Sequence, residues 1–270
     1  MPALGSAVLL GLALLSALGR VQDAVVRYEA KQLQCAGFLE TAESRIQTET
    51  AGRVRHQTST RLGVWQFRAV PSGQGVVLEG WLDSLTISRR SPEITISPDT
   101  DGLLGGRYRG TLSATGSYTE RARPFIPDEV AEVAGMGAAL DDLFPPLPPR
   151  ALAPGKAWTD SRGLTIRRLR DSAASGLPLY RYELERRAES RVAALPGDTL
   201  SVPLRQLSEE QGTFVWHPLL GLVRRERRIV VQTAVPASRS VRQPVRSKVE
   251  QRVTLTRDLR DIRRPGCAAR

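Results

Sequence analysis

The residue types that most often carry catalysis or bind metals are scarce in this chain of 270 residues. It has two histidines, His56 and His217, and two cysteines, Cys35 and Cys267. Each histidine falls in a strand-like segment and has no partner at the spacing of a metal site or of a catalytic triad. Two cysteines without a histidine cluster do not make a zinc site either. The sequence therefore predicts no metal site and no histidine-dependent nucleophile.

The carboxylates are equally isolated along the sequence. An Asp-x-Asp-Gly motif at 99–102 matches the opening of a calcium-binding loop, but Tyr108 occupies the place of the closing glutamate, and turn formation explains the motif better. Asp83, Asp141 and Asp142 have no visible mate for acid–base catalysis. The chain also lacks a nucleophile elbow, a phosphate-binding loop and a dinucleotide-binding fingerprint. We therefore expect a non-enzymatic protein with no catalytic residues and no cofactor.

The two cysteines lie near opposite ends of the chain. In an exported protein, a disulfide between Cys35 and Cys267 would join the ends across a loop of 232 residues. The chain-entropy model gives roughly 5 kcal/mol of stabilisation, as an upper limit, for a closure of that length. We predict this disulfide; two unpaired thiols are the alternative.

The net charge of +11 is concentrated at the C-terminal end, where the last 49 residues hold fourteen basic and four acidic side chains. Arg246, Lys248 and Arg252 alternate with valines and a leucine, as the solvent face of a strand does. These three residues are our candidates for contact with an anionic envelope surface. A solvated strand face without a partner is the alternative. We expect no nucleic-acid partner, because an exported protein rarely meets one.

An apolar run at 7–18 is too short to span a bilayer, but it fits the core of a secretory signal. We predict a signal peptide at 1–19, with the mature chain beginning near Arg20 or Val25. The alternative is a buried N-terminal helix. The protein is accordingly predicted to be exported, to the periplasm or the extracellular space.

Strand-like sequence lies on both sides of one helical segment. In the N-terminal half, Trp65, Phe67 and Ala69 alternate with polar residues, and a shift of apolar parity predicts a bulge near Asp83 and Ser84. The predicted N-terminal strands cover 45–50, 54–58, 65–69, 76–87 and 107–118. The segment from residue 25 is ambiguous between a strand and a short helix, and we favour a strand at 25–30. The predicted C-terminal strands cover 163–170, 178–191, 200–207, 212–217, 222–235 and 245–257.

The central segment combines a helical pattern at 128–144 with a proline-rich connector. Val130, Val133, Leu140 and Phe144 recur at helical spacing and form one apolar stripe. Glycines at 135 and 137 weaken this helix, so it must be held by what it packs on. The prolines that follow favour an extended connector.

These patterns predict a mainly β fold. We expect an antiparallel, strongly curved sheet or half-barrel of about ten to eleven strands, with one central α-helix packed in its concavity. The chain is predicted to be a monomer with a single domain at 20–270. Its parts are an N-terminal half at 20–123, the helix and connector at 124–158, a C-terminal half at 159–257 and a basic tail at 258–270.

A curved sheet can leave part of its concave face open to an apolar ligand. The candidate lining consists of large apolar residues on the strands and the helix: Trp65, Phe67, Trp81, Val133, Leu140 and Phe144. The alternative is that these side chains are simply core. We predict binding of a lipid, another apolar molecule or a lipidated partner in the cell envelope. The second hypothesis is a structural or interaction module that docks on an anionic envelope surface through its basic C-terminal strands.

An export signal, about eleven antiparallel strands and one central helix together resemble the half-barrel carriers and receptors of bacterial lipoprotein localisation. That resemblance implies an incomplete barrel covered by helices, with an apolar cavity for acyl chains. No motif of that family matches residue by residue, so no binding residue is carried over. The segments 99–108 and 145–161 are similar to uncharacterised exported bacterial β-proteins, a family with no established activity.

Overall fold

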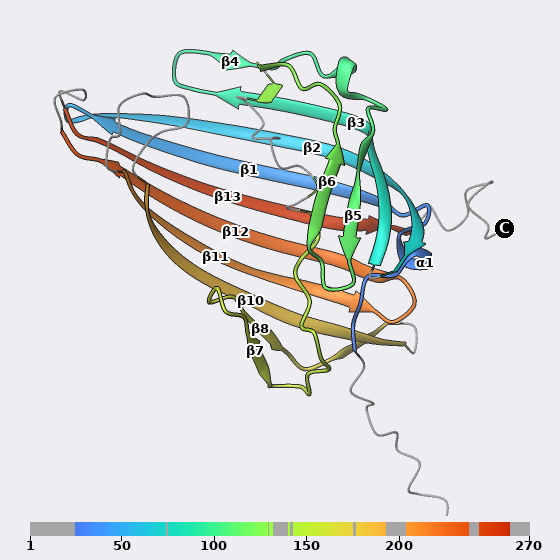
Figure 1. The fold of residues 1–270 in the computed structure, drawn as a ribbon. Coiled ribbons are helices and arrows are strands. Elements are labelled where there is room, and N and C mark those ends of the chain that lie inside the picture. Colours follow the sequence, from blue (N-terminus) through green and yellow to red (C-terminus); the bar gives the residue numbers. More distant parts are fainter. Residues whose placement is uncertain are drawn as a thin grey trace, which may run out of the picture.

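A single antiparallel sheet forms the body of the protein in the computed structural model (Figure 1). The structure describes residues 25–73, 75–128, 130–131, 140, 143–174, 177–192, 204–237 and 243–259. Within that part of the chain the sheet has 13 strands and every strand pair is antiparallel.

The N-terminal half contributes six strands, a short helix and a 3-10 turn. Their bounds are α1 (Ala30–Leu33), β1 (Gly37–Thr50), β2 (Arg53–Ser72), β3 (Gly75–Arg90), β4 (Thr95–Ile96), η1 (Asp101–Leu103), β5 (Tyr108–Ser113) and β6 (Tyr118–Ala122). The C-terminal half contributes the other seven strands. These are β7 (Ala157–Thr159), β8 (Thr165–Arg168), β9 (Ser172–Ala174), β10 (Leu177–Val192), β11 (Leu204–His217), β12 (Gly221–Val235) and β13 (Val245–Asp258).

The strand order places the two halves of the chain on opposite sides of one seam. The order is β6-β5-β3-β2-β1-β13-β12-β11-β10-β8-β7, with β4 on β3 and β9 on β10. The first strand therefore pairs with the last over its full length, from Gly37 opposite Asp258 to Thr50 opposite Val245. Most other neighbours in the sheet are consecutive in the chain, and some of them are joined by tight turns. Between β1 and β2, for example, Ala51 and Gly52 both adopt positive φ, as a two-residue hairpin turn requires.

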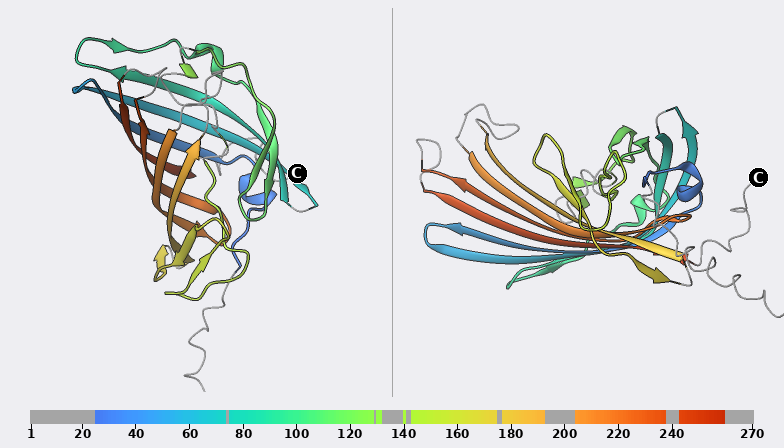
Figure 2. Two further views of the ribbon diagram at one scale, coloured as in Figure 1. Left: turned by 60° about the vertical axis from the view of Figure 1, so that its left-hand side comes forward. Right: turned by 90° about the horizontal axis from the view of Figure 1, so that it is seen from below.

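Bulges help to bend this sheet into an open trough (Figure 2). The register of three strand pairs shifts by one residue, because Asp83 in β3, Arg121 in β6 and Val223 in β12 are each inserted as an extra residue of the strand. Each extra residue increases the local twist and bends its strand. The bulge predicted at Asp83 and Ser84 is thus confirmed. We call the concave side of the trough the inner face and the convex side the outer face.

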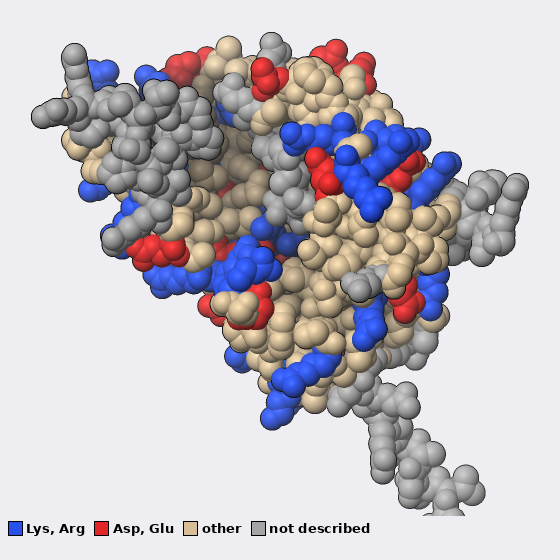
Figure 3. Space-filling view, in the orientation of Figure 1, with Lys and Arg blue, Asp and Glu red and all other residues tan. Residues whose placement is uncertain are grey.

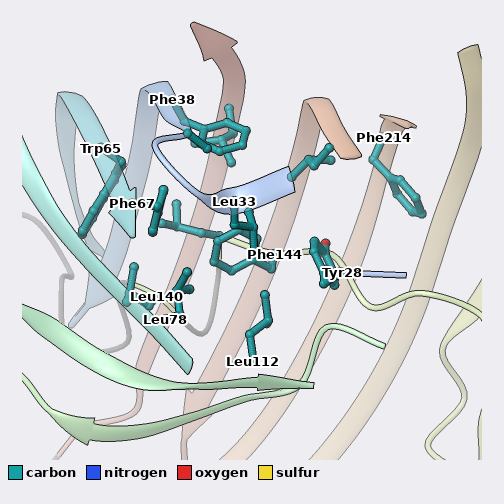
Figure 4. Close-up of a cluster of buried hydrophobic side chains, with 14 of the residues drawn as sticks. Tyr28, Leu33, Phe38, Trp65, Phe67, Leu78, Leu112, Leu140, Phe144 and Phe214 are labelled. Atoms are coloured by element: carbon teal, nitrogen blue, oxygen red, sulfur yellow. The ribbon is translucent and has the colours of Figure 1, made fainter. Parts of the chain in front are cut away.

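One end of the trough is filled by the hydrophobic core (Figure 4). Residues of one parity on each strand point inward, so β1 contributes Phe38, β2 contributes Trp65 and Phe67, and β11 contributes Phe214. The rings contact one another edge to face or stacked, with centroids 5.9 Å apart for Phe38 and Phe67. Tyr28, which precedes α1, closes the end of this cluster.

Several sequence predictions differ from the structure. The strand count is 13, not ten or eleven. The very short strands β4, β7 and β9 were missed because they show no alternation, and the segment predicted as one strand at 107–118 forms both β5 and β6. The predicted strand at 25–30 is wrong: Glu29 caps α1, and its backbone N–H donates to Gln32 Oε1 at 3.1 Å. The segments predicted as two strands at 200–207 and 212–217 belong to the single strand β11, in the part that is described.

The predicted helix at 128–144 lies largely outside the described residues. Its start is helical, since the Val130 and Ala131 N–H groups donate to Pro127 O. Its predicted end is not, because Leu143 and Phe144 form a turn and a bend. The connector that follows packs on the sheet through buried Leu147 and Leu152.

The predicted signal peptide at 1–19 lies outside the described residues, as does the basic tail from residue 260 onward. Both stay predictions. In the part of the chain that is described, no helix is long and apolar enough to cross a membrane.

Candidate functional site

Four of the six predicted apolar lining residues lie together in the core. Trp65, Phe67, Leu140 and Phe144 are each at most 2% exposed. Phe67 contacts both neighbouring rings, with centroids 6.2 Å from Trp65 and 5.5 Å from Phe144. Their mutual packing fills this end of the trough (Figure 4). Phe144 also lines a pocket. Val133 lies outside the described residues.

Trp81 lies on the opposite side of the sheet. The inward residues of β3 in this stretch are Leu78, Gly80 and Leu82, so Trp81 points to the outer face. There the Arg107 guanidinium stacks on its ring at 3.8 Å, and its Nε1 donates to Asp83 Oδ1 at 3.1 Å. Trp81 therefore does not join the other candidate lining residues.

Arg246, Lys248 and Arg252 are exposed on the outer face of β13, as the alternation predicts. Carboxylates lie among them, however: Arg252 donates to Glu250 at 3.1 Å. Hydrogen bonds from Arg228 and Arg252 lower the pKa of Glu250 to about 2. The outer face of β13 therefore carries both charges and is not a purely basic surface.

Cys35 lies just before β1, and Cys267 lies outside the described residues. The pairing of Gly37 with Asp258 brings the chain within reach of this disulfide, because the nine residues from 258 to 267 can span at most about 30 Å. The disulfide stays a prediction.

A pocket of about 400 Å³ opens on the inner face beside the core. Its walls come from four parts of the chain: the β5–β6 turn, the connector, the β7–β8 hairpin and the strands β10 to β12. The described lining residues are Thr115, Gly116, Ser117, Phe144, Pro146, Leu147, Pro149, Trp158, Asp160, Arg162, Leu164, Arg186, Glu210, Arg225 and Arg227. Figure 3 shows a hollow on the side of the molecule seen in Figure 1, with basic side chains along its lower edge.

Specific contacts hold the connector in place as one wall of this pocket. The Leu147 N–H donates to Thr115 O at 2.9 Å, and Tyr28 Oη donates to Pro145 O at 2.9 Å. Gly116, with φ of 92°, is required here, because a Cβ on it would lie 2.6 Å from Pro145 O. The connector thus crosses from the β5–β6 edge of the trough to the β7–β8 edge.

The floor of the pocket is a cluster of four charged residues, which we call the arginine cluster: Arg186, Glu210, Arg225 and Arg227. Glu210 lies at its centre, accepting from Arg186 Nη2 at 2.6 Å and from Arg227 Nε at 2.7 Å. Arg225 Nη2 lies 3.9 Å from the same carboxylate. The side chains of Glu210, Arg225 and Arg227 are 6%, 7% and 10% exposed, whereas that of Arg186 is 37% exposed.

A second buried carboxylate lies on the opposite half of the inner face. Glu40 is 2% exposed, accepts from Trp65 Nε1 at 2.8 Å and pairs with Arg61. Here one guanidinium forms an ion pair with one carboxylate. Burial also raises the pKa of Tyr108, near this pair, and that of Tyr182, on β10, to about 12 each.

Sequence reasoning missed the arginine cluster, although the alternation contained the signal. Tyr180, Tyr182 and Leu184 share the inner face of β10, so the next residue of that parity, Arg186, also points inward. The same holds in β11, where Glu210 has the parity of Phe214. Extending each apolar face by two or four residues would have placed opposite charges beside each other on the inner face.

The described residues contain no group of three or more His, Cys, Asp and Glu side chains that could hold a metal ion.

No protein-family model matches this chain, and no curated protein matches it. Among solved structures, it is similar to the crystal structure of a DUF1329 family protein from Desulfovibrio piger, over 85% of this chain and 88% of that one. The sequence identity is 10% and the TM-score is 0.19, so this likeness carries no argument about function. The resemblance to lipoprotein-localisation proteins is not confirmed by these comparisons.

Proposed function

We propose that the protein binds a lipid or another apolar molecule, free or attached to a partner, in the pocket beneath the connector. The observation that carries this proposal is the set of apolar side chains that several separate segments turn toward one hollow. Phe144 and Leu147 come from the connector region, and Trp158 and Leu164 from the β7–β8 hairpin. A volume of about 400 Å³ falls within the usual range for small-molecule sites.

The position of the pocket supports a ligand of limited size. The aromatic end of the trough is filled by buried rings, so an apolar molecule has no room among Trp65 and Phe67. The pocket lies beside that core and shares Phe144 with it. A single acyl chain or a compact apolar group suits this space better than a whole phospholipid.

Binding without catalysis is part of the proposal. Among the described lining residues there is no histidine or cysteine, and the carboxylates of Asp160 and Glu210 are both engaged by hydrogen bonds. We propose that this binding takes place in the cell envelope, on the strength of the predicted signal peptide.

The proposal is tested by native mass spectrometry of protein purified from its own envelope, and by titration with the fluorescent fatty acid 11-(dansylamino)undecanoic acid. We expect Trp158→Ala, which removes a half-buried wall of the pocket, to weaken binding about tenfold. Trp81→Ala on the outer face is the matched control and should bind as the unaltered protein does. A protein that arrives without ligand and ignores the fatty acid would refute the proposal.

Docking on an anionic surface through Arg246, Lys248 and Arg252 has less support, because Glu250 bonds to Arg252 in the same row. Reversing the charge of all three residues distinguishes the two functions. If binding to anionic vesicles survives this charge reversal, the three residues do not form the docking surface.

A further inference from the structure

A patch of basic and aromatic side chains lies on the outer face of the sheet, toward the edge that β5 and β6 form. We call it the outer patch, and its members are Arg68, Glu79, Trp81, Arg107, Arg109 and Arg121. We infer that the outer patch docks the protein on a membrane surface rich in anionic phospholipids. This inference does not rest on the proposed function, because the pocket lies on the inner face.

The register of β2, β3 and β5 brings the charged members of the outer patch together. Arg68 lies opposite Glu79, and Glu79 lies opposite Arg109, so one row across three strands has an arginine on each side of a glutamate. Arg107 precedes β5, and Arg121 is exposed on β6 at the edge of the sheet. Figure 3 shows basic side chains gathered over β5 and β6, with a few acidic ones among them.

Two carboxylates lie among these arginines. Glu79 pairs with Arg109 Nε at 2.8 Å and with Arg107 Nη1 at 3.6 Å. Asp83 accepts from Trp81 Nε1 at 3.1 Å. The four arginines of the outer patch therefore outnumber its carboxylates, and their exposed guanidinium groups can reach phosphate oxygens outside the protein.

Apolar side chains border the charged row on both sides. On one side, Val70 and Val77 lie opposite each other on β2 and β3, and both are exposed. On the other side, Trp81 lies under the Arg107 guanidinium, which is 3.8 Å from the centre of the ring. Arginines next to apolar and aromatic side chains are typical of a surface that rests among lipid headgroups.

Phe125 adds an exposed aromatic ring beside the outer patch. It is 84% exposed, more than any other large apolar side chain in the described part of the chain. Its position is fixed by the preceding Pro124, which packs on Gly106: a Cβ on that glycine would lie 2.8 Å from Pro124 Cβ. Gly106 is adjacent to Arg107, so the ring lies near the arginines and can enter the membrane interface with them.

An anionic membrane fits these features better than an anionic polymer does. A membrane surface offers both phosphate groups and an apolar layer, whereas an acidic polysaccharide offers no apolar layer for Phe125. A nucleic-acid base would need an open aromatic face for stacking, and the Arg107 guanidinium already lies over the Trp81 ring.

The test is co-sedimentation of the protein with vesicles of phosphatidylglycerol and phosphatidylcholine in equal parts, and with vesicles of phosphatidylcholine alone. We expect binding to the anionic vesicles to be at least about tenfold stronger at low salt, and this preference to shrink as salt is added. Equal binding to the two kinds of vesicle would overturn the inference.

Two triple variants assign the binding to one surface. The first carries Arg68→Gln, Arg109→Gln and Arg121→Gln. The second carries Arg246→Gln, Lys248→Gln and Arg252→Gln, and so removes as many charges from the outer face of β13. We expect the first to weaken binding to anionic vesicles about tenfold or more, and the second to change it less than about threefold. Equal losses, or a larger loss in the second variant, would overturn the role of the outer patch.

The single variant Phe125→Ala separates a membrane from a polymer. It should weaken vesicle binding about threefold, and by the same factor at high salt, because the lost contribution is apolar. Binding to heparin or single-stranded DNA that is tighter than binding to the anionic vesicles, and that Phe125→Ala does not change, would overturn the membrane as the partner. Circular dichroism checks that each variant is folded.

The fatty-acid titration keeps the two proposals apart. The first triple variant should still bind 11-(dansylamino)undecanoic acid as the unaltered protein does, because its three substitutions lie outside the pocket. Loss of vesicle binding with the fatty acid still bound supports the outer patch. Loss of both in this variant would overturn the assignment of vesicle binding to a surface separate from the pocket.

Discussion

Replacing Glu210 by glutamine tests the charge balance of the pocket floor through the stability of the fold. The substitution keeps the shape of the side chain and removes its charge. Glu210 accepts two hydrogen bonds from arginines, at 2.6 and 2.7 Å, and its side chain is 6% exposed. The buried guanidinium groups of Arg225 and Arg227 would lose this carboxylate.

The size of the effect follows from those two contacts. Hydrogen bonds to charged groups contribute about 1.5–3 kcal/mol each, and glutamine can keep one weaker bond of about 1 kcal/mol. Breaking a buried ion pair on one side typically costs about 3–5 kcal/mol. We therefore expect Glu210→Gln to lower the free energy of unfolding by about 3 kcal/mol, measured by urea denaturation followed through tryptophan fluorescence.

The adjacent residue supplies the control. Glu209 lies on the outer face with its side chain 44% exposed and 3.5 Å from Arg187, so Glu209→Gln should cost less than about 1 kcal/mol. The double variant Glu210→Gln with Arg186→Met should recover part of the loss, because it also removes the guanidinium group that bonds to Glu210 at 2.6 Å. Equal costs for the two glutamine variants, or a cost below about 1 kcal/mol at Glu210, would refute the assignment of a buried, charge-bearing centre.

Three further predictions concern the core and the two ends of the chain. Phe67→Ala should lower the free energy of unfolding by about 3–5 kcal/mol, because the ring is 1% exposed and contacts Phe38, Trp65 and Phe144. Trp81→Ala on the outer face should lower it by about 1 kcal/mol. Similar losses for the two variants in denaturant melts would contradict the assignment of Phe67 to the core. Tyr108 and Tyr182, with pKa values of about 12, should stay neutral in the folded protein at pH 11, as ultraviolet titration of the five tyrosines can show. Since the pKa values in the folded protein lie above the unfolded value near 10, the stability that the two neutral tyrosines contribute is fully present below pH 10 and is lost as the pH rises through 12. If all five tyrosines ionise together near pH 10 without unfolding, these two side chains are not buried. Thiol labelling of the denatured, unreduced protein should find no free cysteine if Cys35 and Cys267 are bonded, and two reactive thiols would rule the disulfide out.

The local features of the sheet could be read from the sequence because each depends on few neighbouring residues. The turn at Ala51 and Gly52 includes a glycine, which adopts positive φ without strain, and the alternation around Trp65 reports which side of β2 is buried. The bulge at Asp83 follows from a change of apolar parity within a single strand. None of these predictions requires knowledge of a distant partner.

The pairing of β1 with β13 could not be predicted in the same way. Both strands have 14 residues and mixed polar faces, and many other strands of this chain would offer the same ladder of backbone hydrogen bonds. The end of the central helix was mispredicted because apolar spacing continues through Leu140 and Phe144, whereas the following prolines already impose a turn and a bend.

The candidate site was predicted only in its apolar part. Phe144 was named from its place in an apolar stripe, and it does line the pocket. The arginine cluster was missed because charged residues on strands are ordinarily assigned to solvent, and only the registers of β10, β11 and β12 show that Arg186, Glu210, Arg225 and Arg227 share the inner face.

The seam between β1 and β13 also sets the order in which this protein can fold. Gly37 and Asp258 are neighbours in the sheet but lie 221 positions apart in the sequence, so their contact closes almost the longest loop that the chain contains. During synthesis β1 can pair with β2 at once, but its other edge has to wait for the last strand. Until then the N-terminal half exposes an open strand edge of 14 residues. A chaperone that shields this edge, or transport of the chain before it folds, would protect the protein from pairing with other copies.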